Sequence, residues 1–115
     1  MGDLTANFNR SEFECSCGCG FDDIDDHVVE WCQAVRDFFD RPVTVTSGCR
    51  CQSHNDHVNG SQGSQHLRGT AADIQVEDVD PDKVADFCAE VLLVDGLGRY
   101  NTFTHIDCRG HKARW

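Results

Sequence analysis

Residues 63–76, GSQHLRGTAADIQV, place His66 near the end of a polar loop and Asp73 inside an apolar segment. The segment Ala71–Val76 has the composition and length of a β-strand. A carboxylate in such a strand is costly to bury unless it is paired. We therefore expect Asp73 to have a specific partner, and a metal ion is one candidate.

The residues before this strand predict a helix and a second strand. Apolar positions recur at helical spacing from Ile24 to Phe39, and Val43–Thr46 alternates apolar and polar residues in the manner of a strand. Cys49–Gly69 is rich in Gly, Ser, Asn, Gln and His, so we expect a long functional loop there.

The residues after the strand complete the expected fold. Asp80 followed by Pro81 marks the start of a second helix, which should end before Gly96. A turn at the following glycines then leads into Arg99–Cys108, which holds one or two strands. We expect one domain over residues 1–115, of the α+β class, with two main helices on a small, mostly antiparallel sheet.

The charge of the chain limits its partners. Asp and Glu number 20 against 10 Lys and Arg, which gives a formal net charge of −10. An acidic surface argues against nucleic acid or an anionic membrane as the main partner. No stretch is apolar enough for membrane insertion, and the start, MGDLTANFNRSEF, lacks the features of a signal peptide. We therefore expect synthesis in the cytoplasm. We also expect the protein to be a monomer.

A third polar residue, His105, lies in the expected last strand. Two imidazoles and one carboxylate, from His66, Asp73 and His105, form a ligand set for a catalytic Zn²⁺ because they leave a fourth position for water. His57, in the same loop as His66, is a more distant candidate.

The chain resembles the zinc-dependent D-alanyl-D-alanine peptidases of the M15 family in the stretches SGCRCQSHN, GSQHLRGTAADI and FTHID and in the terminal ARW. The family motif S-x-H-x-x-G-x-A-x-D has each of its fixed positions filled, by Ser64, His66, Gly69, Ala71 and Asp73. This resemblance covers most of the chain and implies the Hedgehog/DD-peptidase fold, with zinc bound by His66, Asp73 and His105.

The resemblance also implies catalytic and substrate-binding residues. Many relatives have an acidic residue three positions before the last histidine, where this chain has Thr102. Asp107 lies on the same strand face as His105, so it is expected either to act as the general base or to orient His105. Arg50, in the S-G-x-R segment, is expected to bind the substrate's carboxylate. Ser64, Gln65 and Tyr100 are expected either to donate or accept hydrogen bonds with the substrate or to brace a loop.

Cysteines allow several interpretations. Two short segments, ECSCGCG and GCRC, contain five of the eight cysteines: Cys15, Cys17, Cys19, Cys49 and Cys51. A second, structural metal, disulfides between the two segments and unlinked thiols all remain open. Cys32 and Cys88 lie on apolar helix faces and are expected in the core.

We thus expect a zinc peptidase that cleaves peptidoglycan stem peptides, either as a D,D-carboxypeptidase or as an endopeptidase of the endolysin kind. Short prophage-type relatives suggest that it reaches the cell wall after release at lysis. One alternative is a catalytically inactive, zinc-containing module that binds cell-wall peptides. Another is a cysteine-centred metal or redox protein.

Overall fold

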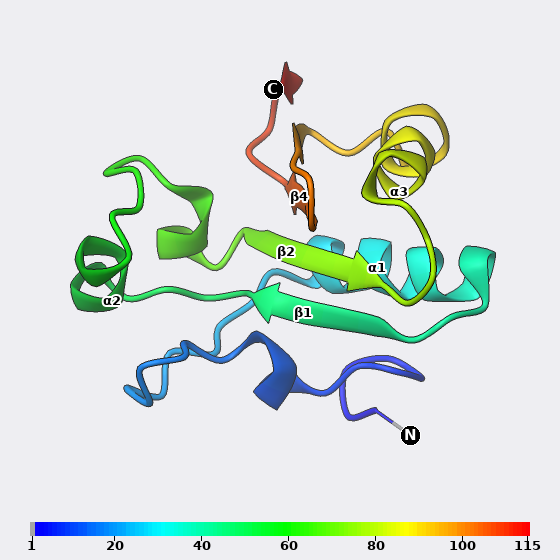
Figure 1. The fold of residues 1–115 in the computed structure, drawn as a ribbon. Coiled ribbons are helices and arrows are strands. Elements are labelled where there is room, and N and C mark those ends of the chain that lie inside the picture. Colours follow the sequence, from blue (N-terminus) through cyan, green and yellow to red (C-terminus); the bar gives the residue numbers. More distant parts are fainter. Residues whose placement is uncertain (1) are drawn as a thin grey trace.

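The computed structural model describes residues 2–115, which form a five-stranded sheet with helices (Figure 1). The strand order is β1-β2-β4-β3-β5, and every pairing is antiparallel except the parallel pairing of β3 with β5. The strands are β1 (Val43–Ser47), β2 (Ala71–Val76), β3 (Gly96–Arg99), β4 (Thr104–Asp107) and β5 (Ala113–Arg114). The expected α+β class with a mostly antiparallel sheet is confirmed.

Three α-helices accompany the sheet: α1 (Asp26–Phe39), α2 (Gln52–His57) and α3 (Pro81–Phe87). The first begins where the Asp25 carboxylate accepts a hydrogen bond from the His27 amide, and the last begins where Asp80 caps it in the same way. A π-helical turn, Cys88–Leu92, extends α3. Short 3₁₀ helices lie at η1 (Arg10–Phe13) and η2 (Gln65–Arg68).

The two faces of the sheet have different roles. Ile74 of β2 and Ile106 of β4 belong to the buried hydrophobic core, together with Val28 of α1 and Val84 of α3. Because side chains alternate along a strand, Asp73 and its neighbours in β4 lie on the opposite face. Helices α1 and α3 therefore cover one face of the sheet, and polar residues gather on the other.

Two sequence-based predictions were wrong in detail. The segment expected as one long loop contains α2 and η2, because Cys51 and Ser64 cap the first turns of these short helices with their side chains. Gly96 and Gly98 lie in strand β3 rather than in a turn. A Cβ at Gly96 would collide with the Asp107 carboxylate, so the glycine makes room for a charged group between neighbouring strands.

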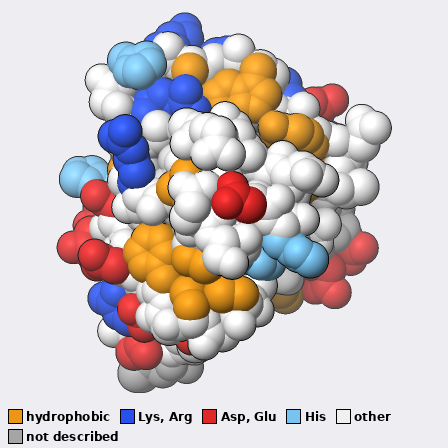
Figure 2. Space-filling view, turned by 90° about the vertical axis from the view of Figure 1, so that its left-hand side faces the viewer, with side chains coloured by type: hydrophobic (Ala, Val, Ile, Leu, Met, Phe, Trp, Pro, Cys, Tyr) orange, Lys and Arg blue, Asp and Glu red, His pale blue; other side chains and the backbone are white. Residues whose placement is uncertain are grey.

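The surface is predominantly acidic, yet its basic side chains are not evenly spread. Figure 2 shows the side of the molecule on which α2 lies, with most of the visible Lys and Arg side chains gathered on the left and acidic side chains both near the centre and around the margin. Within residues 2–115, no helix is long and apolar enough to cross a bilayer.

Candidate functional site

His66, Asp73 and His105 converge on the face of the sheet opposite α1 and α3. The Asp73 Oδ1 atom lies 2.9 Å from His105 Nδ1 and 3.3 Å from His66 Nε2. Asp73 and His105 face each other in the antiparallel pairing of β2 with β4, whereas His66 reaches the site from η2. The structure thus brings together the three ligands predicted from the sequence.

The His66 ring is held in one tautomer by the backbone. Its Nδ1 atom lies 2.7 Å from the carbonyl oxygen of Gly48. A carbonyl only accepts hydrogen bonds, so Nδ1 carries the proton and the lone pair of Nε2 faces Asp73. The side chain is 4% exposed, which leaves little freedom for the ring to turn away.

His105 is held between two carboxylates. Its Nδ1 atom faces Asp73, while its Nε2 atom lies 2.7 Å from Asp107 Oδ2. Asp107 is fully buried and also receives two hydrogen bonds from the Arg109 guanidinium, of 2.8 and 2.9 Å. Asp107 accepts the Nε2 proton, which leaves Nδ1 as the ligand atom. A second carboxylate often orients a metal-binding imidazole in this way.

These groups shift one another's pKa values. Burial would raise the pKa of Asp73, but hydrogen bonds and charge from His105 and His66 outweigh it and lower this pKa to about 2. Burial likewise opposes ionisation of Asp107, yet Arg109 and His105 hold the pKa of Asp107 well below its usual range. The two carboxylates overcome the effect of burial on His105 and raise its pKa.

These three residues fit a zinc ion in donor type and spacing. Two imidazoles and a carboxylate are common zinc ligands, and their ligand atoms all lie within 4.8 Å of one another. Bonds of about 2.0 Å in a tetrahedron separate neighbouring donors by about 3.3 Å, close to the 2.9 and 3.3 Å found here. Within residues 2–115, no fourth His, Cys, Asp or Glu joins this group.

An open pocket of about 510 Å³ lies over the three residues. Arg50 lines it, and its guanidinium donates to Asn55 Oδ1 and Ser47 Oγ, each at 3.1 Å. Its Nε atom is buried and has no hydrogen-bond partner within residues 2–115. The Arg50 guanidinium therefore lies in the same pocket as His66, Asp73 and His105.

The other predicted substrate-binding residues also line this pocket. The Ser64 hydroxyl caps η2 by accepting from the His66 amide, and Gln65 Oε1 accepts from the Thr70 hydroxyl at 2.9 Å. Tyr100 stacks on Phe103 with ring centroids 4.4 Å apart. Ser64 and Gln65 thus brace the segment that carries His66 while bordering the pocket.

Asp107, Thr102 and His57 lie elsewhere. Asp107 is beneath His105 and does not border the pocket, while Thr102 lines a separate pocket beside β1 and β2. His57 is exposed at the end of α2. Asp73 is the only carboxylate among the described residues that line the pocket with Arg50.

Several residues in or beside the pocket were missed by the sequence reasoning. Trp115 packs against the His105 ring, with centroids 5.1 Å apart, and the Arg109 guanidinium lies 4.9 Å from the centroid of the Trp115 ring. The buried Asn55 holds Arg50 from α2. Trp115 could have been found from the terminal ARW, which is one of the stretches that resemble the family. No local sequence pattern marked Asn55 or Arg109 as residues of the site.

A buried His-Asp-His group beneath an open pocket is typical of proteins that bind one metal ion beside a substrate. The family comparison is more specific, because the model described as Peptidase M15 matches residues 6–107. The chain therefore belongs to the peptidase M15 family. No curated protein matched the chain in a separate search.

Proposed function

We propose that this protein is a zinc metallopeptidase that hydrolyses a peptide bond in peptidoglycan stem peptides, as a D,D-carboxypeptidase or an endolysin-like endopeptidase. The observation that carries the proposal is the convergence of His66, Asp73 and His105 beneath a pocket that also contains Arg50. Family membership supports the peptidase chemistry, and the cationic pocket supports a substrate with a free carboxylate.

Zinc, when bound, polarises the scissile carbonyl as a Lewis acid and lowers the pKa of a bound water molecule toward neutral pH. His66 and His105 would hold it through the nitrogen atoms that face Asp73, since their other nitrogens are hydrogen-bonded to Gly48 and Asp107. These hydrogen bonds keep both rings oriented before substrate arrives.

We assign Asp107 the role of positioning His105 rather than that of general base. Both of its oxygens are engaged by His105 and Arg109, and the carboxylate is fully buried away from the pocket. A general base needs to come within hydrogen-bond reach of the proton that it removes.

Arg50 is proposed to bind the terminal carboxylate of the stem peptide. Replacing it with lysine keeps the charge but removes the planar pair of donors, so we expect KM for such peptides to rise about tenfold. Steady-state kinetics on defined stem peptides would measure this change, and zinc content should stay unchanged. The exposed Arg68, which does not line the pocket, provides the control Arg68→Lys. An unchanged KM in the Arg50 variant would remove Arg50 from the substrate site.

The pocket also favours a second candidate, a cell-wall peptide-binding module without catalysis. The observation behind it is that Asp73, itself a ligand candidate, is the only carboxylate on the described pocket wall. In this alternative the same three residues would hold zinc, and Arg50 would still bind the peptide.

Defined muropeptides distinguish the two candidates. We expect the full chain to release new amino groups or D-alanine, to lose this activity with a chelator and to regain it with Zn²⁺. Mass spectrometry of the products would identify the bond. Chelator-insensitive release would exclude the metallopeptidase. Retention on insoluble peptidoglycan without any released fragment would favour the binding module.

A further inference from the structure

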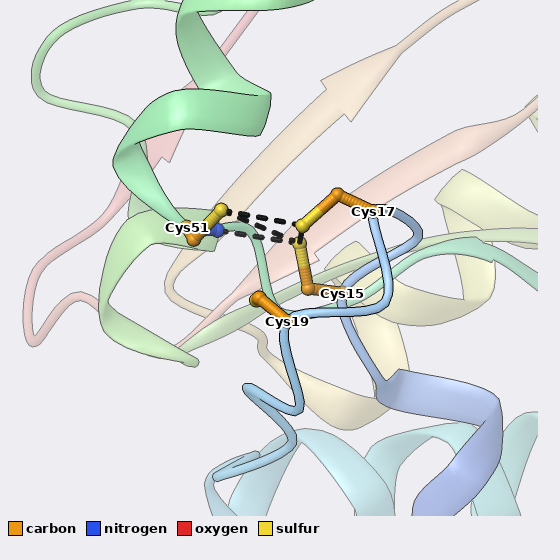
Figure 3. Close-up of side chains that lie close together, drawn as sticks. All are labelled: Cys15, Cys17, Cys19 and Cys51. Carbon is orange, nitrogen blue, oxygen red and sulfur yellow. Dashed lines mark hydrogen bonds between the residues drawn. The ribbon is translucent and has the colours of Figure 1, made fainter.

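A second group of metal-ligand side chains lies outside the pocket. Cys15, Cys17 and Cys19 follow η1, and Cys51 directly precedes α2. Figure 3 shows these cysteines, from two distant parts of the sequence, brought together. One sulfur from each lies within 4.8 Å of the other three.

The sulfur separations are those of ligands around one ion. The Cys15 and Cys17 sulfurs are 3.5 Å apart, as are those of Cys17 and Cys51, and Cys15 and Cys51 are separated by 3.8 Å. Four thiolates at about 2.3 Å from a tetrahedral zinc ion are separated by about 3.8 Å. A disulfide requires about 2.05 Å, so no pair here is at bonding distance.

The backbone shapes this cluster locally. Gly18 and Gly20 adopt φ values of 83° and 90°, which other residues rarely adopt. These two glycines let the chain reverse direction around Cys19, so that three cysteines within five residues approach one point.

Backbone amides also point at two of the sulfurs. The Cys51 amide donates to Cys15 Sγ at 3.5 Å, and the His54 amide donates to Cys51 Sγ at 3.4 Å. Such hydrogen bonds stabilise the negative charge of metal-bound thiolates.

The cluster contains four of the five cysteines that the sequence suggested as metal ligands. Cys49, two residues before Cys51, is 2% exposed and belongs to the hydrophobic core instead. Its inclusion among the candidate metal ligands was therefore wrong. Cys32 and Cys88 are buried in the same core, as expected.

We propose that Cys15, Cys17, Cys19 and Cys51 bind a structural Zn²⁺ ion, distinct from the ion of the His-Asp-His site. Four thiolates form a closed tetrahedral set with no position left for substrate, which is typical of structural zinc. Each cysteine gives up its thiol proton on binding, and no oxidation is involved.

This ion would join the segment after η1 to the segment between β1 and α2, which contains Arg50. Cys51 directly follows Arg50 in the sequence, and α2 then provides Asn55, which holds the guanidinium. The cysteine site therefore supports one wall of the pocket without touching substrate. Its existence does not depend on the proposed peptidase activity.

Zinc stoichiometry tests the proposal directly. Full-length protein would be purified with a reductant and zinc. The number of zinc ions bound per chain would then be measured by elemental mass spectrometry. We expect Cys17→Ser to bind one zinc ion fewer per chain than the unmodified protein. Cys17 is exposed, so the substitution removes no core contact. A Cys17→Ser protein with undiminished zinc would overturn the proposal.

Two controls separate this site from the pocket. Cys108→Ser changes a cysteine outside the cluster and should retain all zinc. His66→Ala should leave the cysteine-bound zinc in place, even if the proposed function fails. Loss of all zinc in His66→Ala would show that the cysteines hold none and would contradict the proposal.

Cobalt substitution identifies the ligands, and intact mass tests the disulfide alternative. Co²⁺ should give thiolate-to-cobalt charge-transfer absorption in the unmodified protein and in His66→Ala, but not in Cys17→Ser. Intact mass under non-reducing conditions should show eight free thiols after metal removal by acid. A disulfide linking Cys51 to Cys15, Cys17 or Cys19 in protein purified without reductant would refute the metal site.

Discussion

His66→Ala is expected to lower peptide hydrolysis by more than about a hundredfold, since even residues that only orient a metal ligand contribute 10- to 100-fold. The variant removes one of the two imidazoles that face the buried Asp73 carboxylate and leaves that carboxylate paired with His105 alone. We expect the pocket zinc to be lost at the same time. Activity on a stem peptide and zinc stoichiometry would both be measured.

His57→Ala provides a matched control for this variant. His57 lies in the same segment between β1 and β2, but it is exposed on α2 and does not line the pocket. Its replacement should leave zinc binding and hydrolysis unchanged. Full activity in His66→Ala would reject the assignment of the metal centre.

Asp107→Asn is expected to weaken zinc binding in the pocket about 10- to 100-fold. Asparagine has nearly the same shape, but it removes the negative charge that faces His105 Nε2 and Arg109. The imidazole would then be a poorer and less firmly oriented ligand. Competition with a chelating indicator would measure the affinity, with Asp95→Asn as a control carboxylate outside the cluster.

The same variant separates the two roles considered for Asp107. A positioning role predicts that excess zinc restores most of the lost turnover. A general base typically contributes 10²- to 10⁴-fold to the rate, and that loss would persist at full zinc occupancy. Persistent loss with unchanged zinc affinity would therefore make Asp107 the base.

The elements best predicted from the sequence are those with strong local patterns. β2 begins and ends where the apolar run predicts, at Ala71 and Val76, and α1 begins two residues after the predicted Ile24. Helical periodicity and strand composition depend on near neighbours, so they are visible without tertiary contacts. The short β5 carries no such pattern, and it forms through its pairing with β3.

In the candidate site, residue types and strand faces could be predicted from local sequence. An aspartate inside an apolar strand needs a partner, and residues two apart in a strand share a face, so Asp73 and the pair of His105 and Asp107 were recognisable. Contacts between distant segments were needed to show that Asp107 lies beneath His105, that Asn55 holds Arg50, and that Cys51 rather than Cys49 meets the N-terminal cysteines. These placements depend on strand register and on the paths of segments far apart in the chain, which local spacing does not encode.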